Sequence, residues 1–132
     1  MRFLLDTGIV SDLVRHPHGR VAKRIAEVGE TLVCTSIVVA AELRCGAAQS
    51  GAAQLAAQLE RVLRAIDVLP LEPPVDAVYG MLRARLEEIG QSIGANDLFV
   101  AAHALALRST LVTDNERDFS RIKALPVENW LR

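Results

Sequence analysis

The sequence has few aromatic residues and few cysteines. Phe, Trp and Tyr together make up 4% of its 132 residues, so the core has to be built mainly from aliphatic side chains and alanine. Cys34 and Cys45 are too far apart for a Cys-x-x-Cys site, and no cluster of cysteine and histidine follows them. We therefore expect free, partly buried thiols in a reducing compartment rather than a zinc site or a disulfide framework.

A long hydrophobic run is also missing. The first apolar segment ends at Asp6, which argues against a signal peptide, and no stretch approaches the ~20 apolar residues of a membrane span. We expect no membrane association and a cytoplasmic location. The net charge of −1 excludes a protein that coats nucleic acid by bulk charge, but leaves room for a local basic groove. Two basic stretches, interpreted as solvated helix faces, contain Arg15, Arg20, Lys23 and Arg24, and Arg117, Arg121 and Lys123.

Short apolar segments alternate with segments of helical spacing along the whole chain. This alternation predicts an α/β fold, a three-layer α/β/α sandwich around a short parallel sheet of four to five strands, in a single domain over residues 1–132. Thr35 or Ser36 is expected to cap the helix that begins near Ile37. The expected strands cover residues 2–5, 31–36, 65–71 and 125–130, with a further strand and turn over residues 109–115. The expected helices cover residues 9–14, 21–28, 37–49, 52–64, 75–89 and 97–108, with a short turn at 118–122.

Two acids follow predicted strands, and two lie in predicted helices. Asp6 follows the first strand and Asp114 the fourth, at the carboxyl edge where open parallel sheets carry their sites. Taken singly, Asp6 and Asp97 are explained as helix caps, and Asp114 as a turn residue. Glu42 has no capping role, because it lies within a helical segment surrounded by apolar residues. A glutamate there risks burial and needs a partner.

The four acids suggest a metal site if the fold brings them together. Two carboxylates about 5 Å apart repel by roughly 3 kcal/mol at an effective dielectric near 20. A divalent cation removes that repulsion, and hard oxygen ligands favour Mg²⁺ or Mn²⁺ over Zn²⁺. A carboxylate-held metal at the mouth of an α/β sheet suits the hydrolysis of a phosphate ester by activated water.

The sequence resembles the PIN-domain ribonucleases, and most closely their VapC-type toxin branch. The resemblance rests on four motifs in order: LLDTGIV, TSIVVAAELRCGA, IGANDLFVAAHALAL and LVTDNERDF. It implies a PIN-like fold and a metal-dependent endoribonuclease that cleaves RNA such as tRNA or rRNA. It also implies a small cognate antitoxin as partner and a homodimer. By resemblance, Asp6, Glu42, Asp97 and Asp114 form the acidic quartet that holds Mg²⁺ or Mn²⁺, and Thr7, Thr113 and Asp118 have secondary roles.

One position departs from the family pattern. Where the family commonly has asparagine, this chain has Gly8, which lacks the side-chain amide that would support the hydrogen bonds of the site. Gly8 also argues against a haloacid-dehalogenase-like phosphatase, which needs a second aspartate at that position. The sequence has neither the paired early acids of a receiver-like domain nor the glycine fingerprint of a nucleotide-binding module, which argues against both classes. A non-catalytic PIN-like interaction scaffold remains as the alternative from a different functional class.

His103 and Trp130 are interpreted as structural residues that take no part in catalysis or metal binding. His103 lies among alanine and leucine with no second histidine or cysteine at ligand spacing, so we expect a half-buried, hydrogen-bonded side chain. Trp130 is expected to anchor the C-terminus to the core or to its edge.

Overall fold

The computed structural model describes residues 2–132 and contains a five-stranded parallel sheet; Met1, the first residue of the expected domain, lies outside the described residues. The strands are β1 (Phe3–Leu5), β2 (Val33–Ser36), β3 (Asp67–Leu69), β4 (Thr110–Val112) and β5 (Val127–Glu128). Their order in the sheet is β3-β2-β1-β4-β5. The central strands are almost entirely buried, because helices cover both faces of the sheet and the strands are correspondingly apolar. The expected parallel sheet is confirmed.

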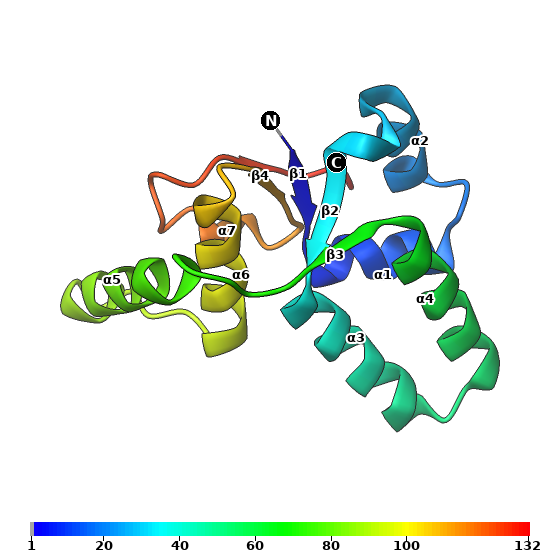
Figure 1. Ribbon diagram of the computed structural model, residues 1–132, viewed down its shortest axis with the longest axis horizontal. Helices are drawn as coiled ribbons and strands as arrows, with labels where there is room; N and C mark the ends of the chain where they lie inside the picture. Colours follow the sequence, from blue (N-terminus) through cyan, green and yellow to red (C-terminus); the bar gives the residue numbers. More distant parts are fainter. Residues whose placement is uncertain (1) are drawn as a thin grey trace.

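The helices form layers on the two sides of this sheet, as expected. In Figure 1, α5 and α6 lie on one side of the strands and α1 to α4 on the other. The α-helices are α1 (Thr7–Arg15), α2 (Arg20–Val28), α3 (Ile37–Ser50), α4 (Ala53–Ala65), α5 (Val75–Glu88), α6 (Ala95–Ala106) and α7 (Glu116–Phe119). No helix within residues 2–132 is long and apolar enough to cross a membrane.

The register of the sheet brings three chain segments to one edge. Leu5 is paired with Thr35 of β2 and with Val112 of β4, so these strands end side by side. The backbone amide of Asp6 then donates to the carbonyl of Val112 at 2.9 Å. Residues that directly follow β1, β2 and β4 therefore gather at the carboxyl edge of the sheet, where the candidate site lies.

Several boundaries differ from those expected, and local turn chemistry explains them. The second strand begins at Val33 rather than at residue 31, because Gly29, with φ of 97°, leads into a 3₁₀ turn over Glu30–Leu32. The expected turn at 118–122 begins at Glu116 instead, since the Asn115 side chain accepts from the amide of Asp118. The expected cap of α3 is Ser36, whose hydroxyl accepts from the amide of Val38 at 3.1 Å.

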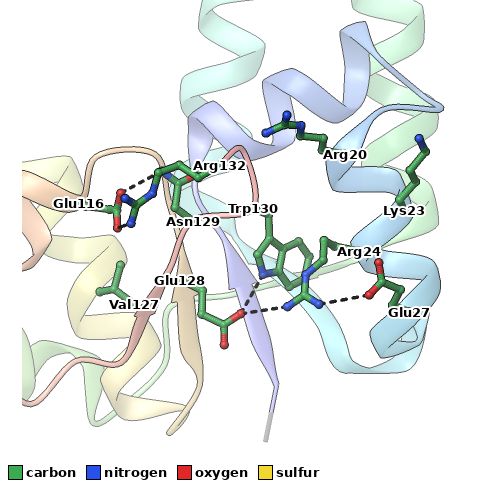
Figure 2. A pocket seen from close by; sticks show the side chains of 10 residues that line it. All are labelled: Arg20, Lys23, Arg24, Glu27, Glu116, Val127, Glu128, Asn129, Trp130 and Arg132. Carbon is green, nitrogen blue, oxygen red and sulfur yellow. Dashed lines mark hydrogen bonds and ion pairs between the residues drawn. The ribbon is translucent and has the colours of Figure 1, made fainter.

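Trp130 and His103, the two residues interpreted as structural, are both buried. Trp130 is buried, with its ring centroid 5.3 Å from that of Phe3, and Arg24 lies over the indole, also at 5.3 Å (Figure 2). It anchors the C-terminal segment as expected. His103 is fully buried rather than half-buried, because α6 is enclosed against α3 and α5, and its Nδ1 lies 2.9 Å from the Ser36 hydroxyl. Both cysteines are free; Cys34 is buried and Cys45 exposed.

Candidate functional site

Four different elements contribute the acids of the predicted quartet. Asp6 lies between β1 and α1, Glu42 lies on α3, Asp97 in the first turn of α6, and Asp114 just beyond β4. Glu42 and Asp114 both act electrostatically on Asp6, and Asp6 and Glu42 both act on Asp97. The fold therefore places the four carboxylates near one another at the carboxyl edge of the sheet.

Asp6 is the buried member of the group, with a relative exposure of 5%. The Thr113 hydroxyl donates to its Oδ2 at 2.7 Å, whereas its Oδ1 is buried and has no hydrogen-bond partner in the part of the chain that the structure describes. Burial raises the pKa of Asp6 most, the Thr113 hydroxyl and the Thr7 backbone amide oppose it, and the charges of Glu42 and Asp114 raise the pKa further. Asp6 occupies the N-cap position of α1, as the interpretation as a helix cap expected, but within residues 2–132 its side chain makes no capping hydrogen bond.

Glu42 is half-buried on α3, where the Thr7 hydroxyl donates to its Oε1 at 3.0 Å. Within residues 2–132 no ion pair involves Glu42; the nearby Arg44 pairs with Glu60 instead, at 2.9 Å. The partner that a mid-helix glutamate requires is therefore a neutral hydroxyl, which leaves the negative charge of Glu42 uncompensated by any cationic side chain of the described chain.

The pKa of Asp97, in the first turn of α6, is raised well above its ordinary value of 3.8. Burial, followed by the charges of Asp6, Glu42 and Asp118, raises its pKa to about 6. Gly94, not Asp97, occupies the N-cap position of α6 and makes no side-chain capping bond, so the interpretation of Asp97 as a cap is wrong. A carboxylate held in this way by like charges is costly in the absence of a cation.

Asp114 is exposed and packs against the first turn of α1 at Gly8. A β-carbon added at Gly8 would lie 2.6 Å from Oδ1 of Asp114 and 2.9 Å from its Cγ. These separations are far below a van der Waals contact, so any side chain at position 8 displaces Asp114. The glycine that departs from the family pattern thus provides the space that the fourth carboxylate occupies.

Asp118 differs from the quartet because it already has partners. Asn115 donates from Nδ2 to its Oδ2 at 3.1 Å, and Nη2 of Arg121 lies 3.5 Å from its Oδ1. Asp118 still acts on Asp97, so it borders the acidic centre. Sequence reasoning missed Asn115 and Arg121 here. The Asn-x-x-Asp spacing at the start of a short helix was the available signal for Asn115.

The four carboxylates have the chemistry of ligands to a hard cation, but their positions are not those of a formed metal site. Within residues 2–132, no three His, Cys, Asp or Glu side chains have the geometry of a metal site, as expected for like charges that repel. The donors are all carboxylate oxygens, which Mg²⁺ and Mn²⁺ prefer. The buried and unpartnered Oδ1 of Asp6 supplies the specific observation that a cation fits, because an orphaned carboxylate oxygen is expensive to bury.

Comparison with known proteins identifies relatives over nearly the whole chain. The family model of the PIN domain matches residues 3–125. Ribonuclease VapC2 from Rickettsia felis is 35% identical over 132 residues, which cover 98% of each chain. The tRNA(fMet)-specific endonuclease VapC from Shigella flexneri is 30% identical over 131 residues, again 98% of each chain.

Solved structures of similar chains agree with the fold. A chain in the crystal structure of VapBC2 from Rickettsia felis, bound to a DNA fragment from its promoter, superposes with a TM-score of 0.91. It is 32% identical, and the match covers 98% of this chain and 99% of that one. A chain of VapBC-1 from nontypeable Haemophilus influenzae gives a TM-score of 0.86 at 30% identity, with full coverage of both chains.

Proposed function

The chain belongs to the PIN-domain family, in its VapC-type branch, and on this premise we propose that it is a metal-dependent endoribonuclease and the toxin of a toxin–antitoxin pair. The observation that carries the proposal is the buried Oδ1 of Asp6, which has no hydrogen-bond partner within residues 2–132 and lies near further carboxylates. A purely structural aspartate at the end of a strand would have capped α1 or formed an ion pair.

In this proposal Asp6, Glu42, Asp97 and Asp114 hold Mg²⁺ or Mn²⁺. The bound metal supplies an activated water and neutralises the charge that develops on the phosphodiester. Two threonines position the acids: Thr113 holds one oxygen of Asp6 and leaves the other free, and Thr7 does the same for Glu42. Asp118, held by Asn115 and Arg121, borders the centre without being one of its four members.

The names of the relatives support a proposal for the substrate and for the protein partner. The Shigella flexneri relative is specific for tRNA(fMet), and the similar solved chains belong to VapBC toxin–antitoxin complexes. We therefore propose an RNA substrate, with tRNA as the first candidate, and a small cognate antitoxin. Homodimerisation, a cytoplasmic location and a single domain over residues 1–132 complete the proposal.

Cleavage of RNA by the purified protein tests the function. We expect Mg²⁺ or Mn²⁺ to be required, EDTA to stop cleavage, and Asp97→Ala to lower the rate by at least about 100-fold while the fold survives. The matched control is Glu30→Gln, an exposed acid outside the centre, which should cleave like the wild type. Sequencing the ends of RNA cut in cells after induction would identify the target.

The non-catalytic scaffold is the competing function, and the same experiment separates it from the nuclease. A scaffold would show no metal-dependent cleavage above that of Asp97→Ala, and it would still bind the antitoxin. Equal residual cleavage in the wild type and in Asp97→Ala would point to a contaminating nuclease and contradict the proposal.

A further inference from the structure

We infer that a basic cavity beside the acidic centre binds the phosphate backbone of single-stranded RNA; this inference rests on the proposed function. The cavity, with a volume of about 370 Å³, lies between the C-terminal half of α5 and residues 120–124, which follow α7. Its cationic residues are Arg85, Arg121 and Lys123, and its apolar floor includes Leu82, Leu86 and Ile89.

The charge of this basic cavity is unbalanced. No Asp or Glu is among its lining residues, and within residues 2–132 neither Arg85 nor Lys123 forms an ion pair. Guanidinium and ammonium groups that lack a carboxylate partner are suited to phosphate oxygens. Solvated helix faces usually carry charges of both signs, so a cavity whose charged lining residues are all cations favours an anionic ligand.

A second charged cavity provides the contrast. It lies between α2 and the C-terminal segment and is lined by four cations and three acids, several of them joined in Figure 2. Arg24 contacts Glu27 and Glu128, each at 3.4 Å, and Arg132 contacts Glu116 at 2.7 Å. Two of its four cations are thus paired and three acids line it, so it offers less unbalanced positive charge to a phosphate.

Arg121 connects the basic cavity to the acidic centre. Its Nη2 lies 3.5 Å from Asp118, and its Nη1 donates to the carbonyl of Ser92 at 2.9 Å. Asp118 is in turn near enough to Asp97 to influence its ionisation. A strand of RNA whose scissile phosphate reached the acids would therefore meet the basic cavity next.

The acidic centre itself makes such a positive neighbour necessary. A polyanion approaching four carboxylates is repelled until the metal neutralises them, and the net charge of −1 gives no overall attraction. Local cations offset that repulsion and fix the backbone beside the reacting phosphate. The floor favours a single strand, because only unpaired bases can turn toward an apolar surface, and Ile89 is 55% exposed there.

Steady-state cleavage of a single-stranded RNA oligonucleotide tests the inference. Lys123→Ala and Arg85→Ala together should raise KM roughly tenfold with kcat unchanged, and lower the salt slope of binding by about 0.7 for each cation removed. Lys23→Ala, in the second charged cavity, is the matched control and should behave like the wild type. Arg85 lies in the last turn of α5, where a cation also stabilises the helix. If the double variant has a lower melting temperature than the wild type, the KM of Lys123→Ala alone tests the inference.

The outcomes separate the inference from the function it rests on. A wild type that neither binds nor cleaves RNA contradicts both. An active wild type with unchanged KM in Lys123→Ala overturns the basic cavity alone. An equal rise of KM in Lys23→Ala also overturns it, because bulk charge would then explain the effect. Normal RNA kinetics with weakened binding of the purified antitoxin would assign the cavity to an acidic segment of that protein instead.

Discussion

Two charged regions of the molecule differ in how their charges are compensated. Around the C-terminal segment, Arg24 and Arg132 pair with glutamates, and Arg24 also covers Trp130. At the carboxyl edge of the sheet, Asp6 and Glu42 accept hydrogen bonds from threonine hydroxyls, and within residues 2–132 neither forms an ion pair. The first region contains its own counter-charges and joins two parts of the chain. Within residues 2–132 the second region has no cationic partners for Asp6 and Glu42, and on the proposed function this difference distinguishes charges that bind a ligand from charges that stabilise the fold.

Removing a hydroxyl that supports the acidic centre should have the largest effect on this contrast. Thr113→Val deletes the donor of a buried hydrogen bond to Asp6 and the acceptor of a partly buried one from the Asn115 amide. We expect a loss of about 1–3 kcal/mol in unfolding free energy and a loss of about 10–100-fold in Mn²⁺ affinity. Chemical denaturation and calorimetric titration measure the two effects.

Thr35→Val is the matched control for that prediction. Thr35 is equally buried and donates to the carbonyl of Leu5 at 2.7 Å, but it contacts no acid of the quartet. It should cost a similar amount of stability and leave Mn²⁺ affinity intact. A similar loss of affinity in both variants would show that general loosening, and not support of Asp6, reduces metal binding.

The stability of the metal-free protein should depend on pH in an unusual direction. The pKa of Asp97 is raised to about 6 and that of Asp6 is raised as well, from the ordinary value of 3.8. The folded state therefore binds more protons than the unfolded state between these values, and stability falls as pH rises through this window. We expect a higher melting temperature near pH 5.5 than near pH 7.5 in EDTA, and a flatter profile for Asp97→Asn. A wild-type profile that rises with pH would contradict the unpaired acidic centre.

A smaller effect is expected at Gly8. Gly8→Ala forces Asp114 to move, because the new β-carbon would overlap its carboxylate. Asp114 is exposed, so the side chain can rotate away and the melting temperature should change little. Mn²⁺ affinity should fall several-fold by displacement of one acid. Gly80→Ala, at an open position of α5, is the control, and an equal affinity in all three proteins would remove Asp114 from the site.

The parts of the site that the sequence predicted depend on regular structure. Asp6 and Asp114 could be placed because parallel strands of similar length end at one edge, and Glu42 because an uncapped acid in an apolar helix needs a partner. The contacts of Gly8 with Asp114 and of Arg121 with Asp118 could not be predicted. They depend on how side chains from separate segments pack across the edge, which local periodicity does not encode.

The same distinction applies to the elements of the fold. Apolar runs and helical spacing located every strand and α-helix, because burial on two faces or on one face imposes those patterns. The 3₁₀ turn over Glu30–Leu32 and the start of α7 at Glu116 escaped prediction. Each depends on a single residue: the 3₁₀ turn on the positive φ of Gly29, and the start of α7 on the capping side chain of Asn115. A single residue of this kind leaves no periodic pattern of apolar residues in the sequence.

Thermal unfolding with and without Mn²⁺ tests the central claim most directly, because it needs no RNA and no partner. The account predicts that Mn²⁺ raises the melting temperature of the wild type, as expected for a ligand that binds only the folded state. It predicts a much smaller rise in melting temperature for Asp6→Asn, which loses the charge of one ligand. It predicts the full rise for Arg24→Ala, because Arg24 pairs with Glu27 and Glu128 near the C-terminal segment. Equal shifts in the wild type and Asp6→Asn would contradict the assignment of the acidic centre as the metal site.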